Sequence, residues 1–276
     1  MTGKALRMGK KIRIGALISG GGSNLQAIID SCENGQINAE MAFVGSDNHR
    51  ADGLKRAAKH DIPSFVVDYA SIIGKFKADP SPGYLPRDFD YDDILAKQTL
   101  VREQDDSDAV RFFLSSRAIA EEKLRIEMSK YPSDLLVLAG FMRNLTPYFI
   151  DSVNRNRENP RIMNIHPALL PAFPGTDGYG DTFRYGCKVA GCTVHFIDYG
   201  EDSGPIIGQR AFAIAADDTI DSIRKKGLKL EWELYPECIR MFAEGRLKTV
   251  RKTFTLNNGK KIQRTVVEIL PPGSKS

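Results

Sequence analysis

The sequence predicts an α/β fold: an open, mostly parallel, twisted sheet with a Rossmann-like amino-terminal half and helices on both faces. Short apolar runs alternate with stretches of helical periodicity, a glycine loop follows the first run, and polar residues stand at the ends of later runs. With 276 residues, 42% of them hydrophobic, the chain can bury one large core. We therefore expect one main domain.

The amino-terminal half alternates between strand and helix signals. Its apolar runs predict buried strands, and the stretches between them carry apolar residues at helical spacing. This alternation is typical of βαβ units, in which the strands are parallel. In order, the predicted elements are a strand at Ile12 to Ile18, a glycine loop at Ser19 to Ser23, a helix at Asn24 to Cys32, a strand at Met41 to Ser46, a helix around Gly53 to His60 and a strand at Ser64 to Asp68.

The second half contains two more central strands and then a β-hairpin-like addition. Ser116 is a suitable N-cap for a helix from Arg117 to about Lys130. Pro236 predicts a kink or restart in the last helix, because proline lacks the N–H that a helix interior needs. The other predicted elements are strands at Leu135 to Ala139 and Arg161 to Ile165, β-segments at Cys192 to Phe196 and Pro205 to Ala213, and a helix that starts at Asp217 to Thr219, runs towards Leu234 and resumes at Cys238 to Ala243.

Two segments do not follow this alternation of strands and helices. The tail from Arg251 to Ile269 alternates around Asn257-Asn258-Gly259, which predicts a terminal β-hairpin. The stretch from Asp79 to Asp108 carries nine acidic and three basic residues and is rich in proline. Because a structureless loop of this length is uncommon in a compact domain, we expect an inserted arm with a helix at Tyr91 to Glu103; partial disorder is the alternative. The predicted domains are residues 12–247 with an insertion at 70–113, and a hairpin appendage at 248–276.

Composition narrows the classes of partner. The net charge of +4 is spread over 39 basic and 35 acidic residues, which favours a small anionic substrate over nucleic acid. The four cysteines lack zinc or haem spacing, so we expect reduced, structural thiols and no metal. No apolar run reaches the roughly 20 residues of a membrane span, and Met1 to Lys11 leads directly into a strand. We expect a cytoplasmic protein that does not bind membranes.

Asn164, His166 and Asp202 form the candidate catalytic set. Asn164 and His166 alternate at the end of a predicted central strand, so both side chains face the same side, at the edge where open α/β sheets bind ligands. Asp202, in the stretch from Glu201 to Pro205, is also a common turn residue. An amide, an imidazole and a carboxylate suit acyl transfer, because negative charge builds on the acyl oxygen while the nucleophile loses a proton.

The glycine loop is the candidate anion site. Gly20 to Gly22 follow a strand, and Ser23 and Asn24 open a helix, so backbone N–H groups and the helix dipole can meet a phosphate. The loop is neither a Walker loop nor a complete dinucleotide fingerprint, and a plain tight turn is the alternative. His195 is as well explained as a hydrogen-bonded core histidine, whereas His49 and His60 are expected at the surface.

Four blocks of sequence resemble the phosphoribosylglycinamide formyltransferases, the folate-dependent enzymes of the third step of purine synthesis. They occur in the order of that family: Ile18 to Ile28, Leu138 to Arg143, Asn164 to Pro171, and Val194 to Phe196 with Asp202 to Pro205. The resemblance covers about Ile12 to Leu247 and leaves the acidic segment as an insertion.

The resemblance implies that the formyl group of 10-formyltetrahydrofolate, the co-substrate, is transferred to the primary amine of 5-phosphoribosylglycinamide. Asn164 would hydrogen-bond the formyl oxygen, His166 would act as an acid in the breakdown of the tetrahedral intermediate, and Asp202 would orient water and stabilise protonated His166. The residues implied for the ribonucleotide are Gly21, Gly22, Ser23, Asn24, Arg117 and Glu231. Those implied for folate are Met142, Arg143, Asn144, Leu145, His195, Asp198, Tyr199, Gly200 and Glu201.

Three departures from the family lie on the acceptor side. Leu228 stands where the family often has lysine, Thr176 to Asp181 replaces a His- or Gln-bearing helix start, and the acidic insertion precedes the expected arginine. The departures leave open a formyltransferase for another phosphorylated amine, such as an amino-sugar nucleotide. A non-catalytic folate or nucleotide sensor is the alternative from a different class. A formyltetrahydrofolate hydrolase and a methionyl-tRNA formyltransferase are not favoured, because each normally carries a further domain. The expected partners are small-molecule substrates, and a homodimer is left open.

Overall fold

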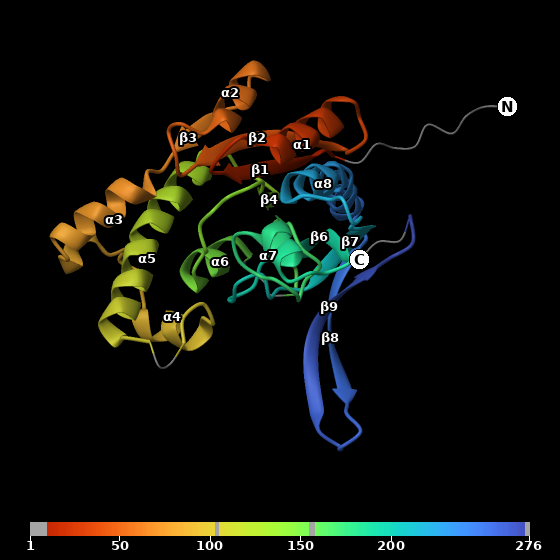
Figure 1. Cartoon of the computed structure of the whole chain (residues 1–276). Coiled ribbons are helices and arrows are strands. Elements are labelled where there is room, and N and C mark those ends of the chain that lie inside the picture. The colour runs from red at the N-terminus through yellow and green to blue at the C-terminus, as the bar shows by residue number, and fades with distance from the viewer. Residues whose placement is uncertain (1–9, 103–104, 155–157, 274–276) are drawn as a thin grey trace.

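The computed structural model describes residues 10–102, 105–154 and 158–273. A seven-stranded sheet in the order β3-β2-β1-β4-β5-β6-β7 forms its centre, and a separate two-stranded sheet, β8-β9, follows at the carboxyl-terminal end (Figure 1). The strands are β1 (Ile12–Ile18), β2 (Ala39–Ser46), β3 (Ser64–Val66), β4 (Leu135–Leu138), β5 (Ile162–His166), β6 (Val189–Phe196), β7 (Ile206–Ala213), β8 (Leu247–Thr255) and β9 (Lys261–Ile269). The helices are α1 (Ser23–Glu33), α2 (Asp52–Lys59), α3 (Tyr69–Ala78), the 3₁₀ turn η1 (Pro82–Tyr84), α4 (Tyr91–Lys97), α5 (Ser107–Ser129), α6 (Pro147–Asn154), α7 (Gly178–Arg184) and α8 (Ile220–Ala243).

The first five strands in the sheet order, from β3 to β5, run parallel to one another, and the last two are joined to the sheet by antiparallel pairing. β1 pairs with β2 on one side and β4 on the other, so the strand order reverses there and leaves a crevice outside the carboxyl ends of the strands. β6 pairs antiparallel with β5 and with β7. The predicted mostly parallel α/β sheet is confirmed, as is the hairpin-like addition after β5.

Helices cover both faces of the sheet, as predicted. On one face, α1 and α8 contribute Leu25, Ile28, Leu234 and Ile239 to a core cluster with the strands. On the other, α3, α5 and α6 contribute Ile72, Leu124, Phe149 and others to a second cluster. No helix in the described ranges is long and apolar enough to span a membrane.

Two helix boundaries were predicted wrongly. The helix expected from Arg117 with Ser116 as its cap begins at Ser107, because the Asp106 carboxylate accepts from the N–H groups of Asp108 and Ala109 and caps it ten residues earlier. The Ser116 hydroxyl instead donates to the Phe113 carbonyl inside the helix.

Of the kink or restart predicted at Pro236, the restart is wrong, because α8 continues through this residue. Both Tyr235 and Pro236 are buried against the sheet. The Tyr235 hydroxyl donates to the Met163 carbonyl at 2.8 Å and lies 3.2 Å from that of Leu138, which holds the helix against β4 and β5. Tertiary contacts at this point override the local preference of proline.

The described part of the acidic segment packs against the main domain. Its predicted helix is α4, which ends at Lys97, and the predicted end at Glu103 lies outside the described residues. Ile94 from α4 packs with Val110 and Leu114 of α5 in a small separate core. Residues 70–113 are thus shared between α3, the short elements η1 and α4, and the first turns of α5.

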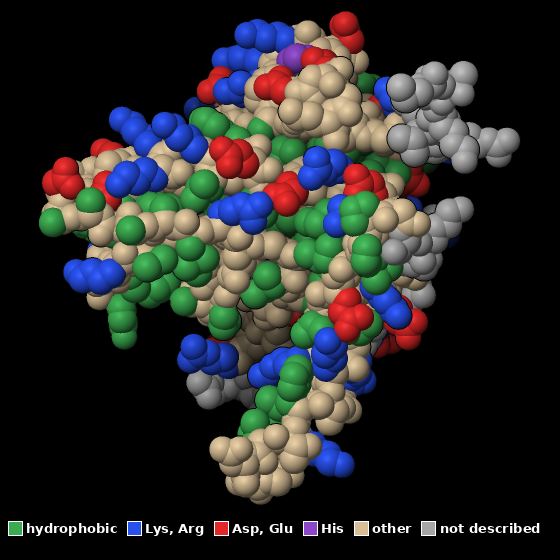
Figure 2. Space-filling model, turned by 90° about the vertical axis from the view of Figure 1, so that its right-hand side faces the viewer, with side chains coloured by type: hydrophobic (Ala, Val, Ile, Leu, Met, Phe, Trp, Pro, Cys, Tyr) green, Lys and Arg blue, Asp and Glu red, His purple; other side chains and the backbone are tan. Residues whose placement is uncertain are grey.

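The carboxyl-terminal hairpin β8-β9 projects away from the body of the molecule (Figure 1). Thr255 pairs with Lys261, so the predicted hairpin is confirmed with the loop Leu256 to Lys260. Lys and Arg side chains gather along it beside apolar ones (Figure 2). Near its base, Leu247 and Val267 pack against the main core, which anchors the hairpin.

Candidate active site

A cavity of about 420 Å³ opens at the carboxyl edge of the parallel strands. One group of lining residues comes from α1, α7 and α8, and a second comes from the loops after β4 and β6. Asn164, His166 and Asp202 line the same cavity. The three residues singled out as catalytic are therefore brought together, although 36 residues separate His166 from Asp202 in the sequence.

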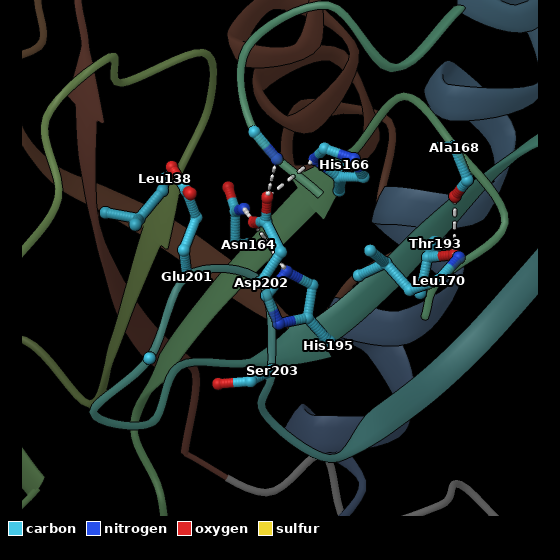
Figure 3. A network of polar contacts seen from close by, with 12 residues as sticks. Leu138, Asn164, His166, Ala168, Leu170, Thr193, His195, Glu201, Asp202 and Ser203 are labelled. Atoms are coloured by element: carbon cyan, nitrogen blue, oxygen red, sulfur yellow. Dashed lines mark hydrogen bonds and ion pairs between the residues drawn. The ribbon is translucent and has the colours of Figure 1, made fainter. Parts of the chain in front are cut away.

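His166 is held between two acceptors. Its Nδ1 lies 3.1 Å from Asp202 Oδ2 (Figure 3). Its Nε2 donates to the Phe173 carbonyl at 2.8 Å. Because a neutral imidazole has only one N–H, this arrangement satisfies both acceptors only when the ring is protonated. The geometry suits a histidine that delivers a proton.

Both residues that hold His166 have unusual backbone conformations. Asp202 has φ 48° and Phe173 has φ 54°, in the left-handed region that few non-glycine residues occupy. Such conformations cost about 1 to 3 kcal/mol each and cluster at functional sites. Their coincidence on the two partners of one histidine supports a functional role for this geometry.

Asp202 is also fixed from other directions. The Gly175 N–H donates to Oδ2 at 2.9 Å, and Oδ1 lies 3.6 Å from His195 Nε2. Burial raises the pKa of Asp202, but the hydrogen bond with His195, the charge of His166 and the Gly175 N–H outweigh it and hold this pKa below the usual range. The carboxylate is therefore ionised at neutral pH.

His195 supports the site from behind and does not line the cavity. It is fully buried, and its Nδ1 faces the Phe196 carbonyl at 2.9 Å. Its Nε2 lies 3.3 Å from Asn164 Nδ2 and 3.6 Å from Asp202 Oδ1. The Asn164 amide also donates to Asp202 Oδ1 at 3.5 Å, so His195 and Asp202 together fix the orientation of this side chain. This position fits the interpretation of His195 as a hydrogen-bonded core histidine.

A polar cluster from α1, α7 and α8 forms the second part of the wall. Glu231, which is 4% exposed, accepts from Asn24 Nδ2 at 2.7 Å and from the Tyr179 hydroxyl at 2.8 Å. Asn24 Oδ1 is buried without a hydrogen-bond partner among the described residues. A buried acceptor without a partner is expected to receive a donor from a ligand or water.

The glycine loop lies beside this cluster. Gly22 caps α1 with φ 68°, which favours glycine, and no side chain caps the first turn. The carbonyls of Gly20 and Gly21 accept from the Gly53 N–H and Arg56 Nε. The free N–H groups at the start of α1 can therefore meet an anion, although only Asn24 of the predicted loop residues lines the cavity itself.

Arg117 is not among the residues that line the cavity. Its guanidinium carbon lies 5.8 Å from the centre of the Tyr69 ring, and Arg143 lies over the same ring at 5.7 Å. Arg117 Nε and Nη1 are buried without a hydrogen-bond partner in the described part of the chain. Burial and, secondly, the charge of Arg143 lower the pKa of Arg117. Arg143 itself pairs with buried Asp47 at 2.5 Å.

The residues expected to bind folate fall into two groups. Those that line the cavity are Met142, Arg143, Asn144, Leu145, Asp198, Gly200 and Glu201. His195 and Tyr199 lie behind it, and the Tyr199 hydroxyl donates to Asp151. Asn144 Nδ2 donates to Glu201 Oε1 at 3.3 Å, which joins the two loops that carry the first group.

Several wall residues were not predicted from the sequence, among them Tyr179, Arg224 and Leu100. Tyr179 lies in the stretch that departs from the family, Arg224 precedes Leu228 by one turn of α8, and Leu100 belongs to the acidic segment. Arg224 pairs with Asp177 at 2.9 Å. No periodicity or motif marks these positions. No group of His, Cys, Asp and Glu side chains within the described ranges could hold a metal ion.

Known proteins of similar sequence identify the family of the chain. The formyl transferase family matches residues 12–239. The phosphoribosylglycinamide formyltransferase of Haemophilus influenzae is 33% identical over 86% of this chain and 89% of its own length. The chain is 32% identical to the trifunctional purine biosynthetic protein adenosine-3 of Chironomus tentans, of which it spans 14%.

Solved structures are similar to this chain as well. Glycinamide ribonucleotide transformylase 1 from Symbiobacterium toebii matches with a TM-score of 0.70 and 35% identity, over 98% of this chain and all of that one. A formyltetrahydrofolate deformylase from Pseudomonas syringae, with a TM-score of 0.65 over 96% of this chain and 67% of that one, shares the fold at 19% identity. The resemblance to phosphoribosylglycinamide formyltransferases is confirmed, and the chain belongs to the formyl transferase family.

Proposed function

We propose that this formyltransferase moves the formyl group of 10-formyltetrahydrofolate to the primary amine of 5-phosphoribosylglycinamide. The observation that carries the proposal is the meeting of Asn164, His166 and Asp202 at one cavity, with His166 Nδ1 3.1 Å from the Asp202 carboxylate. The identity of the relatives supports both substrates.

The proposed reaction starts with attack of the substrate amine on the formyl carbon, which forms a C–N bond and places negative charge on the formyl oxygen. The Asn164 amide would donate to that oxygen, and loss of one such donor typically costs about 3 to 4 kcal/mol. A water held by Asp202 would carry the proton from the new ammonium group. His166 would then protonate the folate nitrogen as its bond to the carbon breaks and tetrahydrofolate leaves.

The two groups of wall residues divide between the substrates in this proposal. The start of α1, Asn24 and Glu231 would receive the ribonucleotide, because free N–H groups suit its phosphate and the buried acceptors suit its hydroxyl or amine donors. The loops with Met142 to Leu145 and Asp198 to Glu201 would receive the folate.

One observation favours a second candidate acceptor. Apolar Leu228 and the Asp177–Arg224 ion pair lie in the acceptor wall, where the family often has a lysine. The alternative is therefore transfer to another phosphorylated amine, such as an amino-sugar nucleotide. Both candidates use the same donor and the same three catalytic residues.

The test measures tetrahydrofolate release from 10-formyltetrahydrofolate with and without glycinamide ribonucleotide. We expect release only when the ribonucleotide is present, a loss of at least about 100-fold in His166→Ala, and no change in His49→Ala, whose side chain is exposed. Release without the ribonucleotide would make the chain a hydrolase. Release with an amino-sugar nucleotide alone would establish the second acceptor, and no release with any amine would favour a sensor.

A further inference from the structure

The acidic segment reaches the cavity through one short turn. Residues Gln98 to Val101, called the strap turn here, follow α4 directly. Gln98 Oε1 accepts from the N–H groups of Leu100 at 2.7 Å and Val101 at 2.9 Å, so the turn is closed by its own side chain. Leu100 lines the cavity together with Asn144, Ile197 and Glu201.

The strap turn is bonded to the loop that carries Asp202. The Thr99 N–H donates to the Tyr199 carbonyl at 2.9 Å. A Cβ atom on Gly200 would lie 2.6 Å from Thr99 Oγ1 and 2.3 Å from Ser203 Oγ, so any larger residue at position 200 would force these side chains to shift. The contact therefore depends on residues from both segments.

A second connection runs through Asp151 on α6. Lys97 Nζ lies 2.9 Å from Asp151 Oδ2, and the Tyr199 hydroxyl donates to the other oxygen of the same carboxylate. One side chain of the main domain thus holds both the end of α4 and the Asp198–Asp202 loop. The packing of Ile94 against α5 fixes the other side of the arm.

We propose that the strap turn belongs to the formyl-donor site: Leu100 is a binding residue for the folate, and Thr99 is a positioning residue for the Asp198–Asp202 loop. This rests on the proposed function, because the loop is assigned to the folate there. The insertion then acts on the donor half of the cavity and tightens the hold on Asp202, which lies three residues beyond Tyr199.

The first test compares Leu100→Ala with Leu95→Ala, a leucine of α4 that is 37% exposed and outside the cavity. Calorimetric titration with tetrahydrofolate should show binding about five- to tenfold weaker in Leu100→Ala, because an apolar contact is removed, and unchanged in Leu95→Ala. The Michaelis constant for 10-formyltetrahydrofolate should rise by the same factor, and that for the amine should not. Equal binding in both variants, or an effect on the amine alone, would overturn the proposal.

The second test uses the unaltered protein and does not depend on the folding of a variant. Hydrogen exchange of the Thr99 to Val101 amides should slow at least about fivefold when tetrahydrofolate is added, because ligand on Leu100 suppresses opening of the turn. Glycinamide ribonucleotide alone should leave these amides unchanged. Slowing by the ribonucleotide and not by tetrahydrofolate would place the turn at the acceptor. The exchange result stands whichever amine accepts the formyl group, so it can be told apart from a failure of the proposed function.

Discussion

Asp202→Asn removes the charge that faces His166 and keeps the size of the side chain. At 3.1 Å, a carboxylate and an imidazolium attract each other by about 5 kcal/mol at an effective dielectric constant of about 20. Asparagine retains an oxygen for the Gly175 N–H, and its dipole preserves part of the attraction. We therefore expect a loss of about 3 to 4 kcal/mol in the transition state, which lowers kcat by about 10² to 10³-fold.

The assay is single-turnover formation of tetrahydrofolate with both substrates saturating, so that chemistry and not binding is measured. The matched control is Asp221→Asn, an exposed aspartate of α8 outside the cavity, which should retain the wild-type rate. A kcat within threefold of wild type for Asp202→Asn, with its fold intact by circular dichroism, would refute the assigned role of the carboxylate.

Three further predictions concern buried polar residues. Burial raises the pKa of Glu121 from 4.5 to about 7, so the folded state binds this proton more tightly than the unfolded state does. Between pH 4.5 and 7 the free energy of unfolding should therefore fall by about 3 kcal/mol as the pH rises. Urea titrations should show that Glu121→Gln removes this pH dependence. Thr193→Val should lower the free energy of unfolding by about 2 to 4 kcal/mol, because the buried Leu170 N–H loses its acceptor next to the site (Figure 3). Tyr179→Phe should raise the Michaelis constant of the amine about tenfold, and not that of the folate, because Glu231 loses a donor.

Each of these has a matched control. Glu127→Gln, on the same helix as Glu121 but at the surface, should keep the wild-type pH dependence. Thr193→Ser keeps the hydroxyl and should recover most of the lost stability. Tyr148→Phe, outside the cavity, should leave both Michaelis constants unchanged. The Glu121 argument fails if the stability of the wild-type protein does not depend on pH. The Thr193 argument fails if Thr193→Val is as stable as the wild type, and the Tyr179 argument fails if Tyr179→Phe raises both Michaelis constants equally.

Most of the fold follows from local signals in the sequence. Strands β1, β2, β4 and β5 are buried on both faces, so they appear as continuous apolar runs, and the pair Asn164 and His166 marks the end of β5. The start of α5 was missed because the capping carboxylate of Asp106 is one acid among many in its segment. Pro236 was misread because only tertiary contacts show that its neighbour Tyr235 is held against the sheet.

The site was predictable only where several residues act together at one strand end. Asn164, His166 and Asp202 were found because amide, imidazole and carboxylate suit one chemistry. The position of Arg117 could not be read from the chain, because the earlier start of α5 and the approach of Tyr69 decide where its guanidinium lies. Leu100 carries no chemical signal at all, since a leucine becomes a wall residue only through the turn that presents it.

The projecting hairpin β8-β9 has a consequence for association between molecules. In the described chain no third strand pairs with it, so its edges offer unpaired N–H and carbonyl groups to any passing strand. Lys252 and Arg264 stand directly opposite each other midway along the ribbon, between the apolar pairs Val250–Val266 and Phe254–Ile262. Lys252 also pairs with Glu268 at 2.8 Å, so a second hairpin that approached in register would have to crowd this ion pair and Arg264. These polar groups oppose the addition of a strand, and high salt would weaken their effect.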